Sequence, residues 1–490
     1  MTKEQYLRQI QSVIDAGPYR ADWGSLSCHP VPDWYRRSKF GIFIHWGIYS
    51  VPAFGNEWYS RNMYDPAHRE FAHHRRTWGD QKTFGYKDFI PLFRGKRFDP
   101  DAWMDLFQKA GARYVVPVAE HHDGFAMYDT DLNPWNAVNM GPKTDAVGRL
   151  KAACQDRGLQ FCASLHRAEH YFFMNMGRTF DSDVNDPRYE DFYGPAVYRP
   201  EFGSEKLGQT TENPHGLGPT EDWLEDWLVR TCEFIDNYRP ALLYFDWWIQ
   251  NLAFKPWLQK IAAYYYNRAA QWGMEVTVNY KHQAFPPGVG VFDVERGALT
   301  DISPVPWQTC TAIGKQSWGY RADNEYKSSR QIICDLIDIV SKNGRLLLNV
   351  GPRADGTLTP EERQVLEDMG RWMEVNGEGI QDTVPWFRFG EGRINNDGGF
   401  FRDNEEKAYT GQDYRFTYKG GCIYAFRMRP DGTPAKIRCL GIPEFHDSGI
   451  AAVEQLGWGP VAFDRDETAL TVYPAPTETD LPVCFRIRLA

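Results

Sequence analysis

The chain has 490 residues and carries 55 Lys and Arg against 65 Asp and Glu, which gives a formal net charge of −10. This negative balance opposes extended contact with phosphate backbones and anionic bilayers, so it argues against nucleic-acid and membrane partners. Aromatic residues make up 15% of the chain, an abundance that suits an enzyme with an aromatic-lined pocket. At about 150 residues per domain, the length predicts two or three domains.

The nine cysteines are odd in number, scattered, and without a C-x-x-C pair, so we expect free and mostly buried thiols. The N-terminal segment MTKEQYLRQIQSVIDAG has no apolar run after a basic start. No apolar stretch approaches the roughly 18 residues needed to cross a bilayer. These features predict a cytoplasmic protein in a reducing compartment.

Short β-branched or aromatic runs alternate with helical patterns from about residue 40 onward. A strand is expected at 40–50, and the next at 113–122. Between them Asp99 can cap a helix, Pro100 suits its first turn, and Gly111 follows its last turn. This is the first unit of a βα repeat, which is typical of a parallel sheet.

The same unit recurs along the chain. Further strands are expected at 159–166, 240–248, 274–280, 288–297 and 345–351. Helical patterns separate most of them, at 145–157, 221–238, 255–273 and 328–344. The count predicts an α/β fold, a (β/α)8-like barrel of the TIM type with about eight units.

The pattern changes near residue 380. Thr359 and Glu362 form a capping box for a last helix that runs to NGEGI (376–380). We therefore assign residues 1–381 to the barrel domain. Residues 382–490 show short alternating strands and turn signals without a convincing helix, which predicts a C-terminal all-β sandwich domain.

One hairpin of the second domain can be placed in detail. YRFTYKGGCIYAFRM (414–428) has two alternating runs with Gly420 and Gly421 at its turn. Two other segments, 66–96 and 170–222, fit neither scheme and are interpreted as long βα loops. In barrels such loops lie at the C-terminal ends of the strands, where active sites are built.

Polar side chains end five of the expected strands. Because these ends meet in one basin of a barrel, we expect the side chains to lie close together. They are His45, the run Glu120 to Asp123, His166 with Glu169 beyond it, Asp246, and the pair Asp293 and Glu295.

Asp246 lies between aromatic residues in LLYFDWW, where a carboxylate is costly to bury unless it is paired or used. A structural salt bridge is the alternative. Hydrolysis of a glycosidic bond needs two carboxyl groups, and Glu295 is the best second candidate, with a surface pair to Arg296 as its alternative. Rivals for the second role are Glu57, Glu169 and Asp293.

His121 and His122 are adjacent at a strand end, where neighbouring side chains should point to opposite faces. No metal-ligand spacing accompanies them, so we predict no metal. Like His45, they suit hydrogen bonding to sugar hydroxyls, with core histidines as the alternative. Three aromatic residues are either core or the apolar wall of a pocket: Trp58, Trp318 and Tyr244.

Six blocks of the sequence together resemble the α-L-fucosidases of glycoside hydrolase family 29. They are KFGIFIHWGIYSVPAFGNEWYSRNMY (39–64), EHHDGFAMYDT (120–130), LLYFDWW (242–248), SWGY (317–320), LLLNVGPRADG (346–356) and NGEGI (376–380). The resemblance implies a retaining hydrolase on a (β/α)8-like barrel with a C-terminal β-sandwich, without a metal or organic cofactor.

The resemblance also implies roles for single residues. Asp246 matches the nucleophile, and Glu295 is assigned as acid/base from its strand end and the downstream WQTCTAIGKQSWGY. Positions that hold fucose hydroxyls match His45, Glu57, Trp58, His121 and His122. Aromatic positions against the C6 methyl group match Phe43, Tyr244 and Trp318. His166 is a further expected contact, although ASLHRAEHYFF (163–173) departs from the family's tyrosine-bearing version.

The expected function is an exo-acting, retaining α-L-fucosidase that cleaves terminal fucose from an oligosaccharide or glycoconjugate through a covalent fucosyl-enzyme. One alternative is a glycosidase of the same fold that acts on another sugar, such as a galactoside. Another is a catalytically silent sugar-binding protein. The sequence leaves the glycan, the linkage and the oligomeric state open, and a homo-oligomer is compatible with it.

Overall fold

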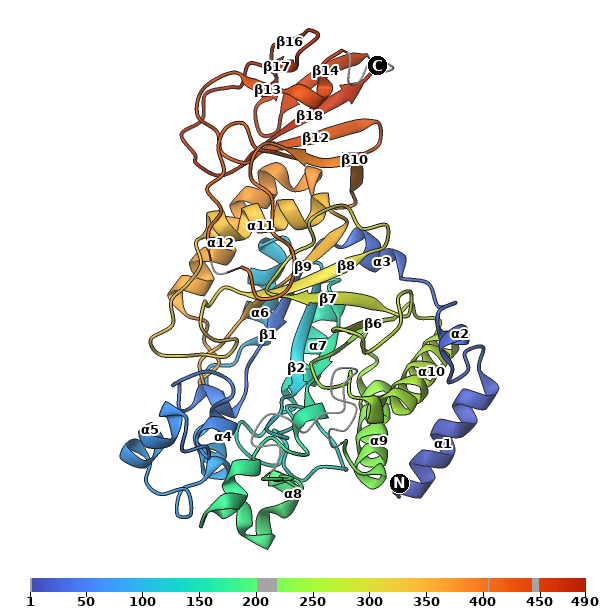
Figure 1. Cartoon of the computed structure of the whole chain (residues 1–490), viewed down its shortest axis with the longest axis vertical. Helices are drawn as coiled ribbons and strands as arrows, with labels where there is room; N and C mark the ends of the chain where they lie inside the picture. Colours follow the sequence, from blue (N-terminus) through green and yellow to red (C-terminus); the bar gives the residue numbers. More distant parts are fainter. Residues whose placement is uncertain (1, 201–217, 404, 443–448) are drawn as a thin grey trace.

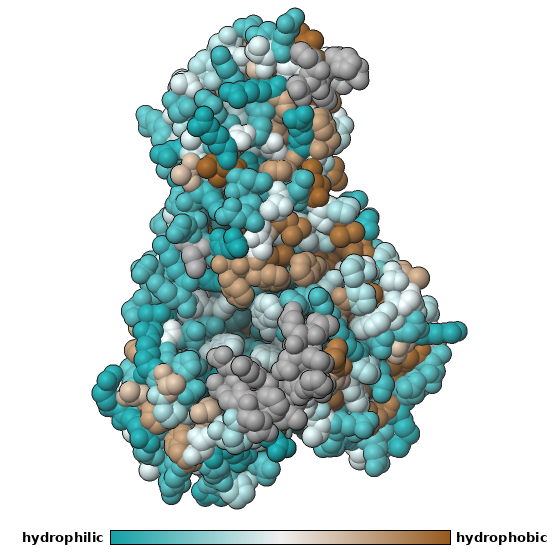
Figure 2. Space-filling model, viewed as in Figure 1, coloured by the Kyte–Doolittle hydropathy of each residue, from teal (hydrophilic) through white to brown (hydrophobic). Residues whose placement is uncertain are grey.

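The computed structural model describes residues 2–200, 218–403, 405–442 and 449–490. Figure 1 shows a barrel domain in the lower part of the molecule and a smaller β domain at the top. Helices α11 (Ser329–Ser341) and α12 (Pro360–Asn376) lie between them, and α11 contacts the first strands of the β domain. Figure 2 shows that the face in view is mostly hydrophilic.

The barrel wall is a parallel sheet in the order β1-β9-β8-β7-β6-β5-β4-β2-β3, closed by pairing of β1 with β2. β3 and β4 are two pieces of one wall strand, separated by Cys162, so the wall has eight positions. The (β/α)8-like fold class is thereby confirmed. The strands are β1 (Phe40–Ile44), β2 (Tyr114–Glu120), β3 (Gln160–Phe161), β4 (Ala163–Leu165), β5 (Leu242–Phe245), β6 (Thr277–Tyr280), β7 (Val291–Glu295), β8 (Trp307–Ala312) and β9 (Gly344–Val350).

Local sequence signals set the ends of the helices around the barrel. The Asp99 carboxylate accepts a hydrogen bond from Ala102 N at 3.0 Å, and Thr359 and Glu362 form the predicted capping box. Gly273 ends α10 in the left-handed region. The remaining helices are α1 (Lys3–Ala16), α2 (Trp23–Leu26), α3 (Asp33–Arg37), α4 (Tyr59–Asn62), α5 (Arg69–Thr77), α6 (Pro100–Lys109), α7 (Ala146–Asp156), α8 (Glu190–Tyr193), α9 (Glu221–Tyr238) and α10 (Lys255–Trp272).

Two expectations for the barrel need correction. Strand β8 was not predicted. It has only six residues, and no helical pattern precedes it to mark it as part of a further βα unit. In addition, the described residues 281–290 and 296–306 contain no helix, so the chain does not supply a helix after every strand. The predicted loop 66–96 contains α5, and part of the predicted loop 170–222, residues 201–217, lies outside the described residues.

A segment from beyond α12 covers the barrel where those helices are missing. Gly399 forms an isolated antiparallel bridge with Ala298, and the side chain of Asn395 donates to Thr300 O at 3.1 Å. Asp403 accepts from Lys327 Nζ at 2.5 Å. The second domain therefore contacts the connections that follow β7 and β8.

The β domain consists of two antiparallel sheets that share an apolar core, which confirms the predicted sandwich. In the predicted hairpin, Lys419 pairs with Cys422 and the two glycines at the turn have positive φ, as the turn requires. The strands are β10 (Val384–Glu391), β11 (Tyr414–Lys419), β12 (Cys422–Arg427), β13 (Ala435–Ile437), β14 (Ile450–Gln455), β15 (Gly459–Pro460), β16 (Phe463–Arg465), β17 (Leu470–Val472) and β18 (Val483–Leu489).

The barrel interior explains which residues reach its C-terminal end. Inward-facing residues such as Phe43, Tyr244 and Leu347 form one buried cluster. Because side chains alternate along a strand, the next inward position lies two residues further on. Those positions carry His45 and Asp246, each just beyond its strand, and Asn349 within β9. At these three positions the side chains thus change from apolar to polar within one layer.

Candidate active site

A pocket of about 500 Å³ opens at the C-terminal ends of the barrel strands. The structure brings all eleven predicted site residues to it: Phe43, His45, Glu57, Trp58, His121, His122, His166, Tyr244, Asp246, Glu295 and Trp318. The other lining residues are Asn56, Glu169, Trp247, Trp248, Gln250, Lys281 and Phe401. The pocket therefore combines two acidic groups at strand ends with histidines and an aromatic wall.

Asp246 is surrounded by groups that favour its ionised form. His166 Nδ1 lies 3.0 Å from Asp246 Oδ2, and His122 Nε2 lies 3.4 Å from the same oxygen. Lys281 Nζ lies 3.4 Å from Oδ1. Burial by itself would raise the pKa of Asp246, but His166 and Lys281 outweigh it and hold that pKa well below its usual range. The group is a carboxylate at neutral pH.

Glu295 has the opposite electrostatic character. Burial and the neighbouring negative charge of Asp246 raise its pKa, and Lys281 only partly opposes this. The indole Nε1 of Trp247 donates to Glu295 Oε2 at 2.5 Å, and Lys281 donates to the same oxygen. The pocket thus holds two carboxyl groups, Asp246 and Glu295, whose pKa values are shifted in opposite directions. The ammonium group of Lys281 contacts both.

Lys281 is the functional residue that sequence reasoning missed. It follows β6 directly, is 1% exposed, and contacts Asp246 and Glu295 as well as Asp293, whose Oδ2 lies 3.6 Å away. Burial lowers the pKa of Lys281, but Cys310 and these carboxylates hold it well above its usual range. The rule that selected polar residues at strand ends, applied to VNYK (278–281), would have found it.

Of the three rivals of Glu295, Asp293 lies beneath the pocket and does not line it. It is fully buried and accepts hydrogen bonds from Gln308 at 2.8 Å and from Tyr244 at 3.2 Å, so its carboxylate is held within the barrel interior. Glu57 Oε2 accepts from Ser317 Oγ at 3.0 Å and from Trp318 N at 2.9 Å. Glu57 therefore holds the loop that carries Trp318.

Glu169 lies against His122, with 3.7 Å between its Oε1 and the imidazole Nε2. Burial raises the pKa of Glu169 to about 7, although His122 opposes the shift. Burial lowers the pKa of His122, but Glu169 and Asp246 raise it to about 9. His122 is therefore a cation at neutral pH that stabilises the carboxylate of Asp246.

The adjacent histidines behave differently from expectation. β2 ends at Glu120, so His121 and His122 lie beyond the strand and both line the pocket, with their ring centroids 4.4 Å apart. The expectation of opposite faces is therefore wrong, since it holds only inside a strand. Burial holds the pKa values of His121 and His45 well below the usual range, so both rings are neutral.

Neutral imidazoles can donate and accept hydrogen bonds to hydroxyl groups or can ligate a metal. One nitrogen from each of His45, His121 and His166 lies within 4.8 Å of the others, a grouping that could hold a cation. His45 Nδ1 contacts Asn349 Oδ1 at 2.6 Å, and Asn349 Nδ2 donates to Trp318 O at 2.7 Å. Asn349, which sequence reasoning also missed, orients both His45 and the Trp318 loop.

Aromatic side chains form one wall of the pocket. The ring centroid of Phe43 lies 5.0 Å from that of Tyr244 and 6.1 Å from that of Trp318. Trp58 also lines the pocket, with its ring edge-on to that of His122 and 5.9 Å between the ring centroids. The tyrosine hydroxyl points away to Asp293, which leaves an apolar surface toward the pocket.

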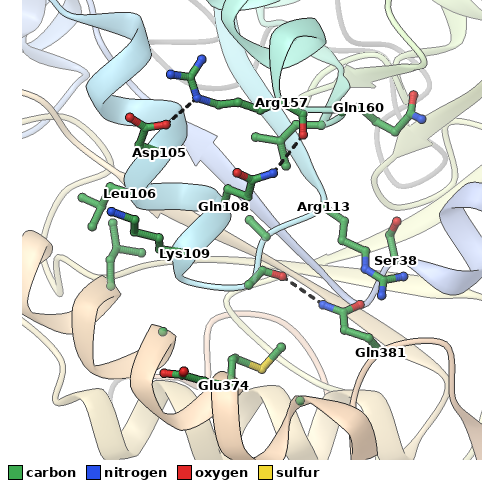
Figure 3. Close-up of a pocket in the computed structure, with 18 of the residues that line it drawn as sticks. Ser38, Asp105, Leu106, Gln108, Lys109, Arg113, Arg157, Gln160, Glu374 and Gln381 are labelled. Carbon is green, nitrogen blue, oxygen red and sulfur yellow. Dashed lines mark hydrogen bonds and ion pairs between the residues drawn. The ribbon is translucent and has the colours of Figure 1, made fainter.

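A larger cavity of about 1390 Å³ lies near the opposite, N-terminal ends of β1, β2 and β3 (Figure 3). Several of its charged groups pair with one another. Arg157 donates to Asp105 at 2.7 Å, and Arg113 makes two 2.9 Å hydrogen bonds to Asp382. Among the described residues, no histidine lines this cavity, and it contains no group of carboxylates and histidines comparable to that around Asp246, so the smaller pocket is the candidate active site.

Comparison with known proteins agrees with this geometry. A family model described as alpha-L-fucosidase matches residues 6–378. The chain belongs to the α-L-fucosidase family. Human plasma alpha-L-fucosidase is 30% identical over 388 residues, which cover 74% of this chain and 72% of the relative. Human tissue alpha-L-fucosidase is 29% identical over 445 residues, 86% of this chain and 81% of the relative.

Solved α-L-fucosidase structures share the fold. The crystal structure of Thermotoga maritima alpha-fucosidase has a TM-score of 0.75 and 28% identity, and the match covers 96% of this chain and all of that one. The same bacterial enzyme in complex with fucose gives a TM-score of 0.74 over 96% of this chain. This α-L-fucosidase family member is a glycoside hydrolase.

Among its described helices, none has the length and apolar character to span a bilayer, and its nine cysteines are free thiols.

Proposed function

We propose that the protein is an exo-acting α-L-fucosidase that hydrolyses terminal α-L-fucosides with retention of configuration. The observation that carries the proposal is the pair Asp246 and Glu295, whose pKa values are shifted in opposite directions within one pocket. Retaining hydrolysis needs one ionised and one protonated carboxyl group about 5 to 5.5 Å apart. Contact of both groups with Lys281 Nζ supports such a close spacing.

In the first step the Asp246 carboxylate attacks the anomeric carbon, while Glu295 gives its proton to the glycosidic oxygen of the departing group. The product is a covalent fucosyl ester of Asp246. In the second step the Glu295 carboxylate takes a proton from water, whose oxygen attacks the same carbon and releases Asp246. Two inversions leave the configuration of the released fucose unchanged.

The pocket provides partners for one terminal sugar. The neutral imidazoles of His45 and His121 suit hydroxyl groups, and the wall of Phe43, Tyr244 and Trp318 suits the C6 methyl group of fucose. Galactose carries a hydroxyl group at C6, which this apolar wall would leave without a partner. We therefore expect fucosides to be cleaved in preference to the matching galactosides.

The test is hydrolysis of 2-chloro-4-nitrophenyl α-L-fucoside, whose leaving group departs without a proton, and of the matching galactoside by the wild type, Asp246→Ala, Glu295→Ala and Glu169→Ala, with and without azide. We expect azide to rescue Asp246→Ala with formation of the inverted β-fucosyl azide, and Glu295→Ala with formation of the retained α-fucosyl azide. Rescue of Glu169→Ala instead of Glu295→Ala would move the acid/base role to Glu169. A wild type that cleaves neither glycoside would favour a silent sugar-binding protein.

A further inference from the structure

The β domain contributes one side chain to the active site. In the segment that covers the edge of the barrel, Phe401 N donates to Glu295 O at 3.0 Å, and Arg402 N donates to Arg296 O at 2.6 Å. The antiparallel bridge between Gly399 and Ala298 holds the same segment two residues before Phe401. Phe401 is thereby fixed to the backbone of the proposed acid/base, and it lines the same pocket.

Phe401 is held in an unfavourable and exposed position. Its φ of +57° is uncommon for a bulky residue, and its side chain is 56% exposed. The ring lies nearly parallel to that of Trp247, at 19° and 6.3 Å between centroids. Trp247 in turn donates to Glu295. An open aromatic surface therefore adjoins the carboxyl group that must protonate the glycosidic oxygen.

We infer that Phe401 and Trp247 form the subsite for the departing group, and that this group is a neutral pyranose stacked through its C–H face on the aromatic surface. The inference rests on the proposed function, because the departing sugar must bind beside the acid/base. The proposed position of fucose is beside the histidines. Phe401 and Trp247 line the same pocket, and Phe401 is exposed to solvent.

A polar group that lines the same pocket supports a sugar over a purely apolar leaving group. Gln250 lines the pocket, and its buried side-chain oxygen has no hydrogen-bond partner within the described part of the chain. A buried acceptor without a partner is costly, and a hydroxyl group of a bound sugar would satisfy it. Aromatic stacking and a hydroxyl contact together match the amphipathic surface of a pyranose.

The test compares two kinds of substrate that differ only in the departing group. Methyl α-L-fucoside releases methanol, which also needs a proton from Glu295 but is too small to stack, whereas α-L-fucosyl-galactose and α-L-fucosyl-N-acetylglucosamine release a pyranose. The readout is the ratio of kcat/KM for the disaccharides to kcat/KM for the methyl fucoside, measured for the wild type, Phe401→Ala and Phe401→Trp. Phe387→Ala is the matched control, because Phe387 is 59% exposed on β10 and does not line the pocket.

We expect Phe401→Ala to lower the ratio about three- to tenfold, the range of one aromatic contact. Phe401→Trp should keep the ratio, as should Phe387→Ala. The inference is overturned if Phe401→Ala leaves the ratio unchanged, and an equal fall in both activities would then mean that Phe401 only supports Glu295. A wild type that cleaves neither the methyl fucoside nor the disaccharides would refute the proposed function itself.

Discussion

Lys281 should set the pH range in which the enzyme works. Its ammonium group contacts Asp246 at 3.4 Å and also Glu295, so replacing it with methionine removes one positive charge from beside both carboxyl groups. Two unit charges 4 Å apart interact by about 4 kcal/mol at an effective dielectric constant of about 20, which corresponds to about 3 pH units as an upper bound. Measured effects of such neighbours are about 1 to 3 units.

The direction of the shift is the same for both groups. Asp246 acts as a carboxylate, so activity is lost as the pH falls through its pKa. Without Lys281 that pKa rises, and the acidic limb of the profile moves to higher pH. Glu295 acts as an acid, and loss of the cation also raises its pKa, so the basic limb moves to higher pH as well. The whole profile of Lys281→Met should therefore shift upward by about 1 to 3 units.

The assay is kcat/KM for phenyl α-L-fucoside as a function of pH, because this poor leaving group requires the acid. Lys281→Arg is the matched control, since it keeps the charge and should retain both limbs. Thermal unfolding of both variants establishes that they are folded. A folded Lys281→Met whose limbs stay in place, or move in opposite directions, would refute the reasoning.

Two further predictions concern residues that support the site and the domain contact. Asn349→Ala removes the partner of His45 and the anchor of Trp318 O, so kcat/KM for fucosides should fall about ten- to a hundredfold while the urea midpoint changes little. Asp338→Ala leaves Arg415 buried without its 2.5 Å carboxylate partner and should lower the free energy of unfolding by about 3 to 5 kcal/mol. Burial would raise the pKa of Asp338, but Arg415 holds that pKa below the usual range. The contribution of Asp338 to the free energy of unfolding is therefore present above its unfolded-state pKa near 4, and it is lost as the pH falls through the lower folded-state pKa. Urea unfolding at neutral pH and at pH about 3 checks both statements; equal midpoints for wild type and Asp338→Ala at neutral pH, or a difference between them that does not shrink at pH about 3, would contradict them.

Local signals in the sequence account for much of the fold. Asp99 ends a strand-to-helix loop because its carboxylate satisfies a free backbone N–H, and the pair Thr359 and Glu362 does the same for α12. The two glycines of the 414–428 hairpin supply the positive φ that a two-residue turn needs. Such signals act within a few residues, so they can be recognised without knowledge of the rest of the chain.

The positions of Asp246, His45 and Glu295 could also be predicted, since alternation along a strand and the shared C-terminal end of a barrel fix where they point. Other features depended on contacts between distant segments. No sequence signal shows that the described residues 281–290 and 296–306 lack helices. Nothing in the local sequence shows that residues near 400 lie against this part of the barrel, where Phe401 contacts Glu295. The pKa values of the two carboxyl groups were equally undetermined, because burial and the charge of Lys281 exist only after the strands close into a barrel. The sequence by itself thus determined the strand ends and their chemistry, whereas tertiary structure decided which charges share a low-dielectric pocket and which surface receives the departing group.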